Sequence, residues 1–67
     1  MSVAKVSEIT SSSTKSFEEA IHEGIKRANK TLSGITGAWI AEQKVVVSKG
    51  KVTEYRVTMR VTFILKD

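Results

Sequence analysis

The sequence predicts one α+β domain with the element order β-α-β-β, in which a three-stranded antiparallel sheet packs against a single helix. Three observations predict this fold. The chain has 67 residues, which is enough for one domain only. One stretch in its first half repeats apolar residues at helical spacing, and its C-terminal stretch alternates apolar and polar residues as a half-buried strand does. A single domain is therefore expected to span residues 1–67.

The first strand is predicted over residues 3–10, where β-branched residues form a short run. The polar residues 11–14, Ser-Ser-Ser-Thr, are expected to form a loop. Ser16 and Glu19 then match a capping box, in which a serine hydroxyl and a glutamate carboxylate satisfy free backbone N–H groups at a helix start. Ser13 is an alternative start one turn earlier, so the sequence leaves the first helical residue open.

The helix is predicted from one apolar stripe at three- and four-residue spacing. The stripe consists of Phe17, Ala20, Ile21, Gly24, Ile25, Ala28 and Leu32. Acidic residues gather toward its N-terminal half and basic residues toward its C-terminal half, an order that suits the helix dipole. Ser33 and Gly34 are expected to form the C-cap, because glycine adopts the left-handed conformation without a Cβ penalty. His22 lies off the stripe and is expected at the surface.

Two strands joined by a hairpin are predicted for the rest of the chain. The first covers residues 38–47, the second covers residues 52–65, and Ser-Lys-Gly-Lys at 48–51 forms the turn. Residues of the last strand point alternately to its two sides. The row on one side is Thr53, Tyr55, Val57, Met59, Val61, Phe63 and Leu65. This row is expected to cover the apolar stripe of the helix, which leaves the other face of the sheet uncovered.

The composition favours self-association. A chain this short buries only about 60% of the surface that its unfolded form exposes, so its own core is marginal. Cysteine is absent and His22 is the only histidine, which removes disulfides and a zinc site as stabilising devices. Oligomerisation remains, so a homo-oligomer is expected. Neither a membrane helix nor a signal peptide is recognisable, and a cytoplasmic location without membrane contact is expected.

Neither nucleic-acid binding nor catalysis is predicted. The net charge is +4, but the 11 basic residues are scattered along the chain rather than clustered. Glycine-rich phosphate loops and nucleophile–histidine patterns are missing, and the neighbouring Glu18 and Glu19 diverge on a helix. The chain is therefore not expected to be an enzyme. Glu42 and Glu54 lie on neighbouring strands and are weak candidates for metal ligands, although solvated charges are the simpler interpretation of both.

Trp39 is the candidate functional residue that stands out. Alternation places it on one face with Ala41, Gln43, Val45 and Val47. Whether that face is covered or uncovered depends on the strand register and on any bulge, which the sequence leaves open. On the uncovered face the indole would be available to a flat ligand or to another subunit. Filling a subunit interface is the simpler explanation, because interfaces are enriched in aromatic residues.

Three segments carry a resemblance to a known family: Ser-Phe-Glu-Glu-Ala-Ile (16–21), Ala-Trp-Ile-Ala-Glu-Gln (38–43) and Glu-Tyr-Arg-Val-Thr-Met-Arg-Val-Thr-Phe-Ile-Leu (54–65). With them, the chain resembles the dodecins over essentially its whole length. The resemblance implies a hollow shell of twelve identical subunits, each with its sheet wrapped around its helix. It also implies storage or sequestration of a flavin, riboflavin or FMN, without catalysis, with the ring stacked on Trp39.

Arg56 departs from the pattern of flavin-binding dodecins, which usually carry glutamine directly after the tyrosine of the last strand. A glutamine amide matches a flavin edge that offers an N–H between two carbonyls, whereas arginine only donates. Dodecins that resemble this chain at Tyr-Arg lack the tryptophan and have been linked to cation binding. In one hypothesis Trp39 stacks a flavin, Gln43 or backbone groups replace the missing acceptor, and Arg56 favours an anionic ligand. In the alternative the shell is purely structural or binds divalent cations or other small ligands, with Glu42 and Glu54 facing a pore or cavity.

Overall fold

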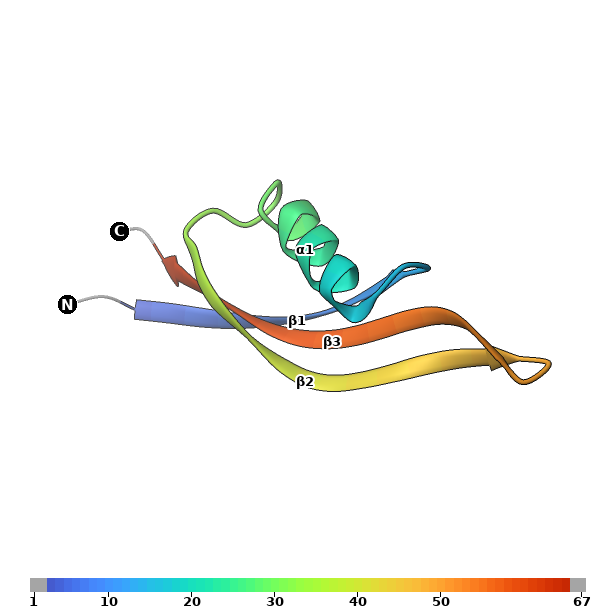
Figure 1. Cartoon of the computed structure of the whole chain (residues 1–67). Helices are drawn as coiled ribbons and strands as arrows, with labels where there is room; N and C mark the ends of the chain where they lie inside the picture. Colours follow the sequence, from blue (N-terminus) through green and yellow to red (C-terminus); the bar gives the residue numbers. More distant parts are fainter. Residues whose placement is uncertain (1–2, 66–67) are drawn as a thin grey trace.

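The computed structural model describes residues 3–65. Four elements follow one another along the chain: β1 (Val3–Ser13), α1 (Phe17–Ala28), β2 (Ile35–Ser48) and β3 (Lys51–Leu65). The strands form one sheet in the order β1-β3-β2, and both pairings are antiparallel. The helix lies across one face of the curved sheet (Figure 1). The predicted β-α-β-β fold is therefore confirmed, and over the described residues the opposite face carries no element of this chain.

The core lies between α1 and the central strand β3. Alternate residues of β3 point toward the helix, and Val57, Met59 and Val61 are fully buried there. Ala20 and Gly24 are the buried residues of α1. The partly buried side chains packed against the core cluster are those of Ile9, Phe17, Ile21, Ile25 and Ile35. The predicted facing rows of the helix and the last strand are thus confirmed for the central part of the strand, whereas Thr53 and Leu65 at the two ends of the predicted row are exposed. The cluster is small, as expected for so short a chain.

The helix begins as predicted but ends earlier. Ser16 is its N-cap, and the Ser16 hydroxyl accepts a hydrogen bond from the Glu19 N–H at 3.0 Å. The C-cap is Asn29 in the right-handed helical region, so the predicted C-cap at Gly34 is wrong. Gly34 has a φ of 77° and its carbonyl accepts a hydrogen bond from the Ile64 N–H at 3.1 Å. This glycine therefore serves the entry into β2, where a Cβ would lie 3.2 Å from the Ile64 carbonyl oxygen.

The serine stretch belongs to a strand, not to a loop. Residues 11–13 continue β1 and pair with Val57, Arg56 and Tyr55 of β3. Serine has little preference for strands, but β3 is 15 residues long and offers hydrogen-bonding groups along this whole stretch. The pairing therefore overrides the local composition, and β1 ends three residues later than predicted.

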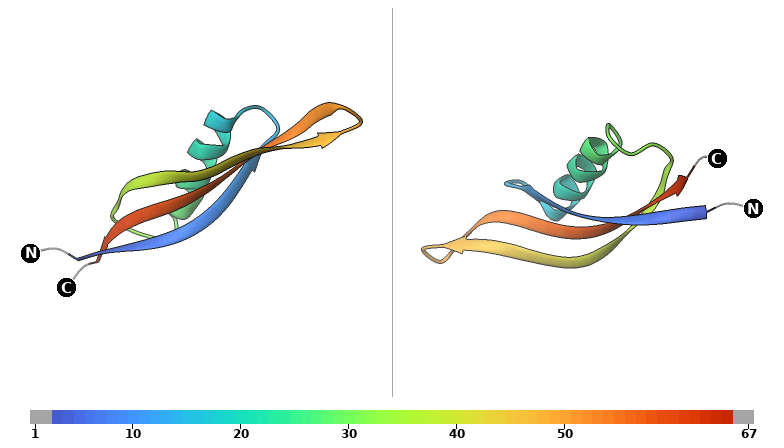
Figure 2. Two further views of the ribbon diagram at one scale, coloured as in Figure 1. Left: turned by 90° about the horizontal axis from the view of Figure 1, so that it is seen from below. Right: turned by 180° about the vertical axis from the view of Figure 1, so that it is seen from behind.

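The β2–β3 hairpin extends beyond the helix, which gives the protomer an elongated shape (Figures 1 and 2). Lys49 and Gly50 at its turn both have positive φ, of 53° and 76°, as the two central residues of a type I′ turn do. Val45, Val47 and Val52 of this projecting part are exposed. Over residues 3–65, no helix has the length and apolar character needed to cross a membrane.

Candidate functional site

A β-bulge in β2 decides on which face Trp39 lies. Before the bulge Trp39 pairs with Arg60, and after it Gln43 pairs with Val57, so Ala41 is an extra residue without a partner. Directly opposed residues of an antiparallel pair project to the same side of the sheet. Trp39 therefore shares the uncovered face with Arg60, whereas Gln43 belongs to the row that faces the helix. The predicted common face of Trp39, Gln43 and their alternate neighbours is wrong, because an extra residue reverses the alternation.

Trp39 is 73% exposed, the largest value among the bulky apolar residues of the described chain. Beside it lies a hollow of about 410 Å³ lined by Val6, Gly37, Ala38, Trp39 and Thr62, mostly through apolar surface. Gly37 leaves this hollow open, because a Cβ built there would meet no atom within 4 Å. An indole beside an open apolar hollow offers a stacking surface for a planar ligand.

A second hollow, of about 320 Å³ and more polar, lies further along the sheet. It is lined by Thr10, Glu42, Gln43, Lys44, Arg56 and Thr58. The Arg56 guanidinium Nε lies 3.4 Å from Glu54 Oε1, and Lys44 is directly opposite Arg56 in the register. The lining thus contains the basic groups of Lys44 and Arg56 and the carboxylate of Glu42. This mixture suits a polar or anionic group better than a cation.

The structure brings only some of the predicted site residues together. Trp39 and Arg56 share one face, but Trp39 pairs with Arg60, four residues from Arg56 along β3, which is about 13 Å. Gln43 borders the polar hollow with Arg56. Glu42 and Glu54 do not meet within the protomer, since Glu42 pairs with Thr58, again four residues away. Among residues 3–65 no three metal-ligating side chains form a cluster.

Arg60 is the site residue that the sequence reasoning missed. It lies directly opposite Trp39, and its Nε is 3.6 Å from Oε2 of Glu8 on β1. Glu8, Arg60 and Trp39 thus form one row across all three strands on the uncovered face. Alternation alone places Arg60 on the polar side of β3, but only the register places it beside the indole.

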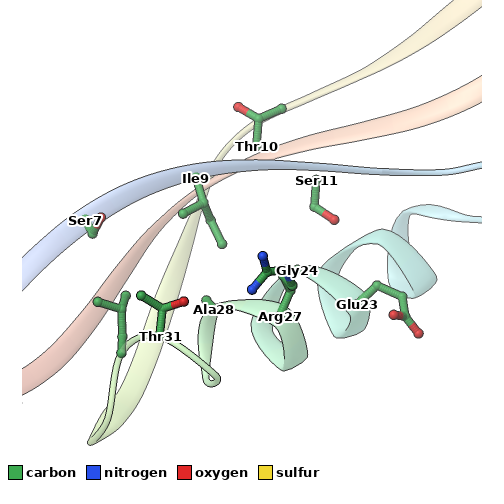
Figure 3. A pocket seen from close by; sticks show the side chains of 10 residues that line it. Ser7, Ile9, Thr10, Ser11, Glu23, Gly24, Arg27, Ala28 and Thr31 are labelled. Atoms are coloured by element: carbon green, nitrogen blue, oxygen red, sulfur yellow. The ribbon is translucent and has the colours of Figure 1, made fainter.

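A third hollow lies on the other side of the sheet, between α1 and the edge strand β1. Its volume is about 460 Å³, and Ile9, Ser11 and Gly24 contribute to its lining. Figure 3 shows Ile9 and Ser11 pointing from β1 toward the helix, while Thr10 points to the opposite face. None of the residues predicted for the site lines this third hollow. His22 is exposed on the helix surface, as predicted.

Comparisons with known proteins agree with this architecture. The sequence model of the dodecin family matches residues 3–66. The calcium dodecin of Mycobacterium tuberculosis is 39% identical over 67 residues, which is 98% of this chain and 93% of that protein. Its crystal structure, described as a calcium-chelating antigen with a calcium-binding site, has a TM-score of 0.82 at 34% identity and covers 96% of this chain and 91% of that one.

A single-residue variant of the T. thermophilus dodecin has a TM-score of 0.94 and 30% identity, with both chains covered completely. The order of strands and helix, the length of the chain and the sequence match thus lead to the same result. The chain belongs to the dodecin family.

Proposed function

We propose that this protein binds a flavin, riboflavin or FMN, without catalysing a reaction on it, and that the isoalloxazine ring stacks on Trp39. The observation that carries the proposal is the exposure of the indole, 73%, beside an open apolar hollow on the uncovered face. Stacking of one aromatic ring on another contributes about 0.5–1.5 kcal/mol beyond the burial of area. The role that fits such a site is storage or sequestration of the ring.

The proposal includes a homo-oligomer, the twelve-subunit shell of the dodecin resemblance. One protomer covers only one side of a ring that lies on Trp39, so the other side needs a group from a second copy. Self-association is also supported by the small core and by the exposed Val45, Val47 and Val52 of the projecting hairpin. A chain of this size without disulfides commonly gains its stability in this way.

Arg56 is the proposed contact at the polar end of the ligand, and Gln43, whose side chain belongs to the helix-facing row, borders the same polar hollow. Both line the polar hollow, at about 13 Å from the row of Trp39. When the flavin ring stacks on the indole, the side chain of the flavin is free to extend along the sheet toward this hollow. Arg56 and the facing Lys44 then favour an anionic group such as the phosphate of FMN.

A fluorescence titration tests the proposal. Riboflavin and FMN are added to the purified oligomer, and stacking on the indole is expected to quench flavin fluorescence to saturation. Trp39→Ala is expected to weaken binding at least about tenfold, the equivalent of about 1.4 kcal/mol. Val3→Ala, which removes another exposed apolar side chain at the start of β1, serves as the matched control. Full flavin affinity in Trp39→Ala would contradict the proposal.

Binding of a divalent cation is the second candidate, favoured by the similarity to the calcium dodecin of M. tuberculosis. In this chain Glu42 is the carboxylate in the polar hollow, and ligands from other subunits have to complete a site there. Calorimetric titration of the oligomer with calcium tests this function. Uptake that Glu42→Gln abolishes and Glu54→Gln leaves intact supports it, and the absence of heat at millimolar calcium refutes it.

A further inference from the structure

We propose that Arg60, oriented by Glu8, determines which ring the stacking site prefers: a ring that carries a negative charge, in place of the neutral ring. The inference rests on the proposed function, because it concerns the ligand on Trp39. It assigns a role to Arg60 instead of Arg56, the arginine that the sequence pattern singles out. The observation behind it is the row Glu8–Arg60–Trp39 across the uncovered face.

The register places Arg60 beside Trp39 on the uncovered face. Residues directly opposite in an antiparallel pair have Cβ atoms about 4.5–5.5 Å apart, and long side chains reach past that distance. Arg60 is therefore the cation nearest to Trp39 by register, and its side chain is 53% exposed on the same face. A planar ring larger than the indole that stacks on Trp39 extends toward the guanidinium.

Glu8 determines where that charge lies. Its carboxylate is 3.6 Å from Arg60 Nε on the strand opposite to Trp39. An exposed ion pair of this kind adds little stability. It does restrain the arginine across the sheet, and it engages one nitrogen of a group that has five N–H donors. Donors on the other guanidinium nitrogens remain available to a ligand.

The protonation state of the N–H at the edge of the flavin ring decides how well the ring binds beside Arg60. A flavin edge offers an N–H between two carbonyls, and arginine accepts no hydrogen bond, so Arg60 cannot pair with that N–H. After loss of the proton, the same edge is an anionic acceptor that a guanidinium matches well. An opposite charge within about 4–6 Å shifts such an equilibrium toward the charged form by about one pH unit or more. Arg60 is therefore expected to promote deprotonation of the bound ring.

The experiment is a spectrophotometric pH titration of riboflavin bound to the assembled protein. It runs from about pH 7 into the alkaline range, where lysine side chains also titrate. The measured quantity is the pKa of the ring N–H. Arg60→Gln is expected to raise this pKa by about one pH unit relative to the unmodified protein. Arg60→Lys, which keeps the charge, is expected to retain most of the effect. Lys51→Gln is the matched control, because it removes one positive charge at the far end of β3, nine residues or about 30 Å from Arg60.

Each result decides between the alternatives. Equal ring pKa values in Arg60→Gln and the unmodified protein, with riboflavin still bound, overturn the inference and leave the proposed function intact. An equal shift in Lys51→Gln also overturns it, because the general charge of the protein would then be the cause. Absence of riboflavin binding by the unmodified protein refutes the proposed function itself. Should Arg60→Gln fail to assemble, Arg60→Met takes its place, because it keeps the length of the side chain and removes the charge: the ring pKa is expected to rise by about one pH unit, and an unchanged ring pKa refutes the inference.

Discussion

Replacing Gly24 by alanine adds one methyl group where α1 packs against both β1 and β3. A Cβ at this position would lie 2.6 Å from Met59 Cε and 2.8 Å from Ser11 Cβ. The methionine methyl group is the end of a flexible side chain and can move aside. Ser11 Cβ is attached directly to the backbone of β1, so relief of this contact requires the helix and the strand to separate.

Two opposing effects determine the size of the change in stability. Alanine in place of glycine inside a helix contributes about 1 kcal/mol of helix propensity. The contact with Ser11 falls about 0.7 Å short of the distance at which carbon atoms pack, and overpacking of this kind costs about 1–3 kcal/mol. The steric effect is therefore the larger one, and Gly24→Ala is expected to lower the free energy of unfolding by about 1 kcal/mol.

Urea unfolding followed by circular dichroism measures this difference, at one protein concentration because the stability of an oligomer depends on it. The sharper test is Gly24→Ala in a Ser11→Gly background, where the Cβ of the neighbour is gone. There the same substitution is expected to be neutral or stabilising by up to about 1 kcal/mol. Gly37→Ala, where no atom lies within 4 Å, is the matched control. An unchanged or raised stability of Gly24→Ala in the parent background refutes the reasoning.

Three further substitutions test the cap, the turn and the hollow. Ser16→Ala removes the acceptor of the Glu19 N–H and is expected to cost about 1 kcal/mol in urea unfolding, with Ser33→Ala as a neutral control. Lys49→Gly relieves a positive φ and is expected to stabilise the protein by about 1 kcal/mol in thermal unfolding, whereas a loss of stability would show that the turn is unstrained. Gly37→Val fills the hollow beside Trp39 and is expected to weaken riboflavin binding at least about tenfold, with stability unchanged. Undiminished affinity in this variant would place the ligand elsewhere.

The fold could be predicted from the sequence because its determinants are local periodicities. The helical stripe and the alternation of the last strand each extend over many residues, so errors at single positions do not change the result. The predictions failed at the element ends. Residues 11–13 are in β1 because the partner strand is long, and Gly34 serves β2 because of a carbonyl contact with Ile64. Both depend on residues far away in the sequence, which no local pattern reports.

The site was only partly predictable, for a reason that one residue illustrates. Trp39 can be identified by its type, but its neighbours follow from the register, and the register contains a bulge at Ala41. Because of that extra residue, Trp39 and Gln43 lie on opposite faces, with Trp39 opposite Arg60 and Gln43 opposite Val57. A bulge has no characteristic residue type, so the sequence does not show that the alternation of faces reverses there.

The uncovered face combines features that a solvent-exposed sheet face would not need. Its rows contain charges that pair within the face, Glu8 with Arg60 and Glu54 with Arg56, so polar groups are available to keep it hydrated. Yet its bulkiest exposed residue is an indole, placed where Gly37 leaves the adjacent position empty. Exposed apolar surface next to an empty position is costly unless something covers it, since burial of apolar area stabilises by about 25 cal/mol per Å². The planar ligand that we propose over Trp39, with Arg60 near its edge, accounts for the indole, the glycine and the charged row together, whereas general interface packing accounts only for the indole.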